Sequence, residues 1–186
     1  MRYVSTRGKA PPLDFAGVLL AGLAEDGGLY VPEAWPKIST TEAASFEGKP
    51  YSEVATNLMA RFTESSIHSG DLEAIIDEAY RDFFHPEVAP LRNISPNESV
   101  LELFHGPTLS FKDYALQVVG RLFDHVLQRA GLHMTVVGAT SGDTGSAAIE
   151  AVQGRDSITA FILHPKGRVT SVQRRQMTTV NSKNIH

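Results

Sequence analysis

A single lysine, Lys112, lies in the segment "HGPTLSFKDYAL" of residues 105–116. The segment runs from a turn-forming Gly-Pro pair into a helical pattern, and the lysine stands where that helix should begin. A cation is mildly disfavoured there, because a helix N-terminus carries partial positive charge. The neighbours Phe104 and Phe111 are aromatic, and an apolar environment favours the neutral amine. A neutral amine can form a Schiff base with a carbonyl carbon. A surface lysine paired with Asp113 is the alternative interpretation.

A second stretch, "GATSGDTGSA" at residues 138–147, is rich in small and polar residues and leads into a helical pattern. Small residues let backbone N–H groups approach a ligand, and a helix N-terminus offers unpaired N–H groups to an anion. The spacing is not that of a dinucleotide fingerprint, a P-loop or a nucleophile elbow. The pattern therefore favours a small anion such as a carboxylate or phosphate. A plain strand-to-helix turn, capped by Asp143 or Thr144, is the alternative.

The elements expected around these two stretches alternate between strand and helix. Strands are predicted at 99–104, 132–140 and 157–164, and helices at 111–129, 144–153 and 168–179. This alternation favours a parallel sheet with right-handed crossovers and with cover on both faces. In such sheets ligands bind beyond the carboxyl ends of the strands, so both stretches should share one edge. An amine beside an anion loop suggests pyridoxal phosphate and an amino-acid substrate.

The first half of the chain has helical patterns without the alternating strands. Helices are predicted at 14–24, with Asp14 as N-cap, at 51–62 and at 71–84, and a proline-rich loop follows at 85–99. We therefore predict two domains, 1–95 and 96–186. The fold class is α/β: a mostly helical N-terminal region, then a three-layer parallel βαβαβα lobe. Three parallel strands leave two open edges, so we expect this lobe to be an incomplete part of a larger domain.

Composition excludes several classes of protein. The chain has 186 residues, 42% of them hydrophobic and 20% charged, with a net charge of −4, as in ordinary globular proteins. It shows no clustered basic face for nucleic acid and no membrane-spanning run, and because residues 1–12 lack the apolar stretch of a signal peptide we do not expect a secreted protein. It has no cysteines, and its seven histidines lack metal-ligand spacing, so no metal site is expected. We expect a cytoplasmic protein.

Five blocks carry a family resemblance: "YVSTRG", "DGGLYVPE", "LELFHGPTLSFKD", "VGATSGDTGSAAIEA" and "ILHPKGRVTSVQRRQM". In this order, from residue 3 to the end, they closely resemble the threonine synthase family in its bacterial and fungal form. The resemblance implies a fold-type II pyridoxal-phosphate enzyme that converts O-phospho-L-homoserine and water into L-threonine and phosphate. The cofactor-phosphate loop of the family, and its hydroxyl residue facing the ring nitrogen, lie beyond the part that these residues match.

The resemblance also implies roles for individual residues. Lys112 matches the Schiff-base lysine. Asp143 stands where many relatives outside this subgroup carry an asparagine near the cofactor. The substrate carboxylate would be held by Thr140, Ser141, Gly142 and Thr144, and His105 and Ser110 would line the pocket. The 186 residues alone are expected to be inactive.

Three hypotheses remain as alternatives to a threonine synthase. A related fold-type II phospho-lyase or dehydratase would share the lysine and the anion loop. A non-catalytic fragment would act as a binding module. A bare Rossmann-like anion-binding domain is disfavoured by the family blocks. The oligomeric state stays open as well.

Overall fold

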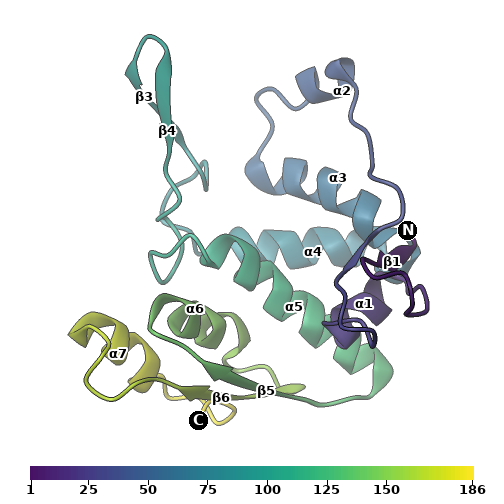
Figure 1. The fold of residues 1–186 in the computed structure, drawn as a ribbon. Helices are drawn as coiled ribbons and strands as arrows, with labels where there is room; N and C mark the ends of the chain where they lie inside the picture. Colours follow the sequence, from purple (N-terminus) through teal and green to yellow (C-terminus); the bar gives the residue numbers. More distant parts are fainter. The chain divides into compact units, whose positions relative to one another are not determined.

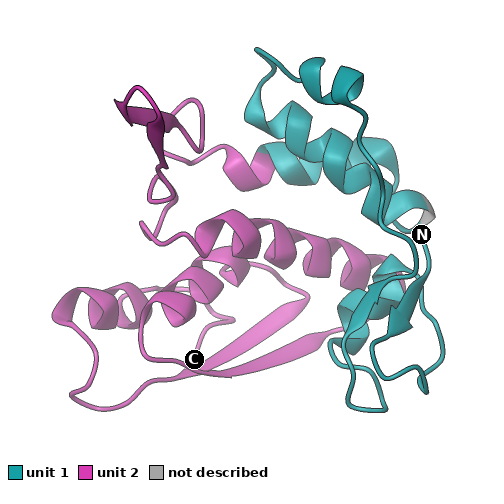
Figure 2. Ribbon diagram, turned by 45° about the horizontal axis from the view of Figure 1, so that its top comes forward, with its two compact units in different colours: residues 1–77 teal, residues 78–186 magenta. Residues whose placement is uncertain are grey.

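The chain forms two compact units, residues 1–77 and residues 78–186 (Figure 2). The computed structural model describes the backbone of residues 1–186 and every side chain except that of Ser65. Each unit is described by itself below. The division predicted from the sequence, at residues 95 and 96, stays a prediction. None of the described helices is both long and apolar enough to cross a membrane.

The first unit combines a short antiparallel pair of strands with helices. Its elements are β1 (Tyr3–Ser5), α1 (Phe15–Ala21), β2 (Tyr30–Pro32), α2 (Thr40–Ala44), α3 (Tyr51–Thr63), a 3-10 turn (Glu64–Ser66) and the greater part of α4 (Ser69–Tyr80). Asp14 caps α1 as predicted, because its carboxylate accepts a hydrogen bond from the N–H of Gly17 at 2.8 Å. The core of the unit includes the buried side chains of Ile67, Leu72 and Ile76. The two three-residue strands were too short to be predicted.

The second unit holds a hairpin and a parallel βα arrangement (Figure 1). Its elements are β3 (Leu91–Ser95), β4 (Glu98–Leu101), α5 (Asp113–Ala130), β5 (Met134–Ala139), α6 (Asp143–Val152), β6 (Ile158–Leu163) and α7 (Ser171–Thr178). Strands β5 and β6 pair in parallel from Met134 opposite Ile158 to Ala139 opposite Leu163. The predicted α/β class with parallel strands is therefore confirmed.

One predicted strand is wrong in its pairing. The residues of 99–104 that form a strand belong to β4, which pairs antiparallel with β3, and β3 lies in the stretch predicted to be loop. Pro96 and Asn97 form the connection between the two strands, and Pro fixes a backbone angle that suits such a turn. Nearly all of the hairpin is exposed. Its apolar residues therefore resembled those of a buried strand without being buried.

The third parallel neighbour comes instead from the end of the chain. The N–H of Ala160 donates to the carbonyl of Asn184, and the N–H of His186 donates to the carbonyl of Ala160, both at 2.8 Å. The side-chain amide of Asn184 donates to the carbonyls of Val152 and Ile158 at 2.8 and 2.9 Å. The C-terminal residues are thereby fixed beside β6.

Helices α5 and α6 cover one face of the β5–β6 pair (Figures 1 and 2). They approach closely at Gly120, where an added Cβ would lie 2.5 Å from the carbonyl oxygen of Ala151. On the other face Val137, Phe161 and Leu163 are exposed.

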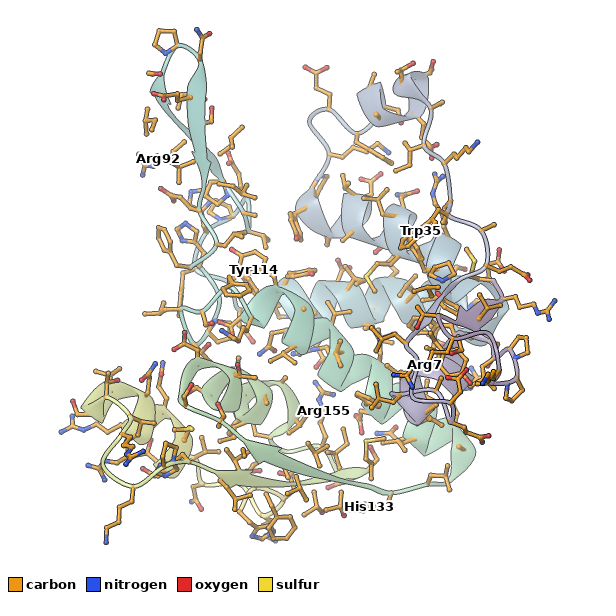
Figure 3. All side chains as sticks on the ribbon, viewed as in Figure 1. Arg7, Trp35, Arg92, Tyr114, His133 and Arg155 are labelled. Atoms are coloured by element: carbon orange, nitrogen blue, oxygen red, sulfur yellow. The ribbon has the colours of Figure 1, made fainter. Side chains whose placement is uncertain are left out.

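A polar cluster joins the end of α4 to α5 and to the residues after α6. Arg155, labelled in Figure 3, pairs with Glu78 at 3.1 Å and with Asp124 at 3.2 Å. Glu78 also lies 3.0 Å from the Nε of Arg121. Burial lowers the pKa of the Arg121 guanidinium, against the opposing effect of Glu78. The cluster therefore holds α5 through Arg121 and Asp124, away from the loop that precedes the helix.

Candidate functional site

The loop that leads to Lys112 is held by a buried carboxylate, Asp113, at the first position of α5. Asp113 accepts hydrogen bonds from the N–H of Thr108 at 2.8 Å and from the Thr108 hydroxyl at 2.7 Å. Gly106 packs against it so tightly that an added Cβ would lie 2.5 Å from the Asp113 Cβ. Burial raises the pKa of the Asp113 carboxyl, and the Thr108 hydrogen bonds act in the opposite direction. Asp113 therefore bonds Thr108, and it is not the partner of Lys112 that the alternative interpretation required.

The turn just before the lysine has an unusual backbone. Leu109 has a φ of 64°, a left-handed conformation that costs a residue with a side chain roughly 1–2 kcal/mol. Ser110 stabilises the turn: its hydroxyl accepts from the N–H of Lys112 at 3.3 Å, and its carbonyl accepts from the N–H of Asp113 at 3.0 Å. The structure thus places Ser110 beside Lys112 as part of the turn.

Lys112 occupies the N-cap position of α5. Its Nζ lies 3.9 Å from Oδ2 of Asp143 and 4.5 Å from the centre of the Phe111 ring. The Lys112 side chain is 28% exposed, and Phe104 and Phe111 are 52% and 61% exposed. The sequence suggested that aromatic neighbours would enclose the amine, but in the structure they do not. Its close electrostatic partner is a carboxylate from a distant segment.

The second stretch forms a tight loop in front of α6. The hydroxyl of Thr140 accepts from the N–H of Gly142 at 3.2 Å and from the N–H of Gly145 at 3.0 Å. Gly142 is the N-cap residue, with a φ of 150°, and it has no side chain to cap the helix, so the Thr140 hydroxyl takes the N–H of Gly145 in the first turn instead. The alternative that Asp143 or Thr144 caps α6 is therefore wrong. The Thr140 hydroxyl organises the loop from inside.

The first turn of α6 leaves donors available. Ser141, Asp143 and Thr144 are exposed, whereas Gly142 is buried. Among the hydrogen bonds of the described residues, none uses the N–H of Asp143 or of Thr144. Unpaired N–H groups at a helix N-terminus are the usual donors to a bound anion. The loop can therefore present two backbone donors next to the carboxylate that faces Lys112.

Helix α7 contributes two side chains that the sequence did not single out. The Nε2 of Gln173 donates to Oδ1 of Asp143 at 2.6 Å, and the Nε2 of Gln176 donates to the carbonyl of Thr108 at 3.2 Å. Thr170 and Gln173 also form a capping box at the start of α7. The T-x-x-Q pattern could have predicted that helix start, but not the contacts with loops 30 and 68 residues away in sequence.

His105 is directed to a different set of partners. Its ring lies 2.8 Å from a carboxylate oxygen of Glu102, with the His85 and Phe104 rings 5.0 and 4.6 Å away. The hydrogen bond with His105 lowers the pKa of the Glu102 carboxyl. The contacts of the described residues do not join the His105 ring to Lys112. Within those residues, no three His, Cys, Asp or Glu side chains are arranged to hold a metal ion.

Comparison with known proteins adds a family to this geometry. Residues 2–80 match the family described as "Threonine synthase N terminus". The chain is 58% identical over its full length to threonine synthase of Pseudomonas aeruginosa and 43% identical over 99% of its length to that of Schizosaccharomyces pombe. It is 41% identical to threonine synthase-like 2 of Xenopus laevis over its full length. It spans 40%, 38% and 40% of these three proteins.

Solved structures give the same result. The chain superposes over its full length on PLP-bound threonine synthase from Brucella melitensis, with a TM-score of 0.97 and 53% identity. It superposes on yeast threonine synthase with a TM-score of 0.94 and 39% identity. It covers 40% and 39% of those chains.

Proposed function

The chain belongs to the threonine synthase family, whose N-terminal part it matches, and from this membership we propose that it supplies the cofactor-binding lysine of a pyridoxal-phosphate enzyme. The proposed reaction converts O-phospho-L-homoserine and water into L-threonine and phosphate. Because the chain spans 40% of the length of its Pseudomonas relative, the activity of the whole protein is part of the proposal. The cytoplasmic location stays a prediction.

One observation supports the proposal above all. An amine, Lys112, lies within 3.9 Å of Asp143, the first residue of α6, and the N–H groups of Asp143 and Thr144 are unpaired among the described residues. An aldehyde cofactor needs an amine that it can reach, and Lys112 is partly exposed. An amino-acid substrate brings a carboxylate, which suits the donors at the start of α6. The residues present therefore fit both a pyridoxal aldehyde and a substrate carboxylate.

The chain's own residues then have separable tasks. Lys112 would hold the cofactor through its aldehyde carbon, and the Nζ of Lys112 would be placed to move protons at the substrate Cα and Cβ. When bound, pyridoxal phosphate supplies an electron sink for the charge that develops at Cα. Ser141, Gly142 and Thr144 would surround the substrate carboxylate, with Thr140 holding the loop in shape. Asp143 would face the cofactor and the lysine.

The second candidate function is that of a related fold-type II phospho-lyase or dehydratase. The chain is 41% identical to threonine synthase-like 2 of Xenopus laevis and 43% identical to the threonine synthase of Schizosaccharomyces pombe. These two values are close, so they do not separate a threonine synthase from a threonine synthase-like protein. The 58% identity to the Pseudomonas enzyme favours threonine synthesis. Following threonine against keto-acid release, with O-phospho-L-homoserine as substrate, distinguishes the two.

The test of the proposal is chemical trapping. We expect borohydride reduction of the protein treated with pyridoxal phosphate to fix the label on Lys112. The matched controls are Lys112→Ala, which should lose the label, and Lys183→Ala, which should keep it. A label on Lys9, Lys37, Lys49, Lys166 or Lys183 with Lys112 unmodified would overturn the assignment.

We further expect the 186 residues alone not to make threonine, because they match only the N-terminal 40% of the Pseudomonas enzyme. The assay follows phosphate and threonine with excess cofactor. Turnover of roughly 1–10 s⁻¹ that disappears in Lys112→Ala would contradict this expectation.

A further inference from the structure

Helix α7 carries a glutamine whose side-chain amide has a determined orientation. The Oε1 of Gln173 accepts from the hydroxyl of Thr170 at 2.9 Å and from the N–H of Thr170 at 3.3 Å. The N–H of Thr170 can only donate, so the atom that faces it must be the amide oxygen, to which the Thr170 hydroxyl donates as well. The Nε2 group is left to donate on the other side, where it meets Oδ1 of Asp143 at 2.6 Å. The helix cap therefore decides which end of the amide faces Asp143.

The same side chain is tightly packed against the loop. An added Cβ on Gly142 would lie 2.5 Å from Cδ of Gln173. Gln173 thus contacts the N-cap residue of α6 and hydrogen-bonds the residue after it. A hydrogen bond to an ionised carboxylate is shorter and stronger than one between neutral groups. Asp143 itself is 53% exposed, so in the absence of this contact water could take its place at the carboxylate.

The two oxygens of Asp143 then have different partners. Oδ1 accepts from Gln173, and Oδ2 lies 3.9 Å from Nζ of Lys112. Fixing one oxygen of a planar carboxylate restricts the rotation that would move the other. We propose that Gln173 is a positioning residue, which holds the Asp143 carboxylate so that its second oxygen faces the Lys112 amine. The importance of that amine for catalysis rests on the proposed function, whereas the geometry does not.

The experiment measures the Asp143–Lys112 contact directly in the 186-residue chain. A carbodiimide activates a carboxylate, and an amine in contact with it then forms an amide with net loss of one water. We expect the unmodified protein to give a crosslinked peptide joining Lys112 to Asp143, identified by tandem mass spectrometry.

Gln173→Glu is the sharpest variant. A glutamate has the same shape and keeps both contacts with Thr170, since glutamate suits the capping box, but it replaces the donor by an oxygen that repels Asp143. We expect the Lys112–Asp143 crosslink to fall by about tenfold or more, as for the loss of one hydrogen bond to a charged group. Gln173→Met, which removes the hydrogen bonds to Thr170 and to Asp143, should lower the yield of the crosslink by the same factor. Far-UV circular dichroism checks that each variant is folded.

Thr170→Ala is the matched control. It removes the hydroxyl of the capping box, while the N–H of Thr170 still fixes the amide and the contact with Asp143 is untouched. We expect it to keep the crosslink. The proposal is overturned if the parent gives no Lys112–Asp143 crosslink, if Gln173→Glu and Gln173→Met keep it, or if Thr170→Ala loses it equally.

Labelling with pyridoxal phosphate provides a second, independent readout. If Gln173 acts through Asp143, Gln173→Glu changes the labelling of Lys112 in the parent but changes it no further in Asp143→Asn. Additive effects would show that Gln173 acts on the fold and would overturn the proposal. Should Lys112 not be labelled in the parent, the proposed function fails, and the crosslink still decides whether Gln173 positions Asp143.

Discussion

Replacing Asp113 by alanine tests the idea that this buried carboxylate builds the loop carrying Lys112. The change removes the acceptor of two hydrogen bonds from Thr108, at 2.8 and 2.7 Å, from a fully buried position. Hydrogen bonds to charged groups contribute about 1.5–3 kcal/mol each. Relief of the buried charge offsets part of this, because burial disfavours the ionised form. We expect a net loss of about 2–4 kcal/mol in the free energy of unfolding of the chain.

The assay is urea unfolding followed by far-UV circular dichroism, with the slope checked for constancy. Asp113→Asn should cost less, about 1 kcal/mol, because its oxygen can accept from the Thr108 N–H while its amide donates to the hydroxyl. Asp156→Ala, at an exposed carboxylate in the same unit, should stay within about 0.5 kcal/mol of the parent. An Asp113→Ala protein as stable as its parent, or an equal loss in Asp113→Asn, would refute the reasoning.

The pH dependence of this cost has a definite sign. Burial raises the pKa of Asp113 above its value of 3.8 in the unfolded chain. The protonated form is therefore favoured by folding, and this contribution is present below pH 3.8 and lost as the pH rises through the folded-state pKa. Asp113→Ala should therefore lower the free energy of unfolding more near pH 3.8 than at neutral pH.

Two further predictions concern other parts of the chain. In the first unit, hydrogen bonds from Ser5 above all, and from the N–H groups of Gly28, Lys9 and Ala10, lower the pKa of Asp26 from 3.8 to about 2. Its contribution to stability should be complete above pH 3.8 and lost as the pH falls through about 2; Trp35 fluorescence during acid titration should show this loss, and Asp26→Asn should abolish it. In the second unit, Gly120→Ala should cost about 1–3 kcal/mol in urea unfolding, since the new Cβ would overlap the Ala151 carbonyl. Gly70→Ala, a helical glycine whose nearest neighbour would be 3.6 Å away, should be neutral or stabilising, and equal losses in both variants would contradict the packing argument.

Elements with a strong local pattern could be predicted from the sequence. The helix expected at 111–129 is found at 113–130, because one broad apolar stripe is enough to define an amphipathic helix. Strand pairing depends on contacts between distant residues and was not predictable in the same way. The segment 99–104 was predicted as a strand of the parallel sheet, yet its first residues belong to β4 and pair in an exposed hairpin. Residues 184–186 show no strand pattern, but backbone hydrogen bonds place them beside β6.

The site shows the same division between local and distant information. The sequence predicted that Lys112 and the loop before α6 would lie at one edge, because both follow expected strands. That the lysine's partner is Asp143 depends on a side-chain contact across 31 residues of chain, and that Asp143 is itself bonded to Gln173 depends on a third segment. Neither contact leaves a periodic signal. The aromatic neighbours of Lys112 suggested burial, but an isolated aromatic residue does not say which way its ring faces.

These contacts explain why a lysine can stand at the N-terminus of α5. A cation near that end of a helix costs roughly 0.3–1 kcal/mol, and an anion there gains a similar amount. Asp113 occupies the first turn of α5, and Asp143 occupies the first turn of α6 with its Oδ2 3.9 Å from the amine. Each carboxylate is favourable at its own helix terminus, and together they offset the cost of Lys112. The amine can therefore stay at a position where a second ligand, an anion bound by the free N–H groups of α6, would lie next to it.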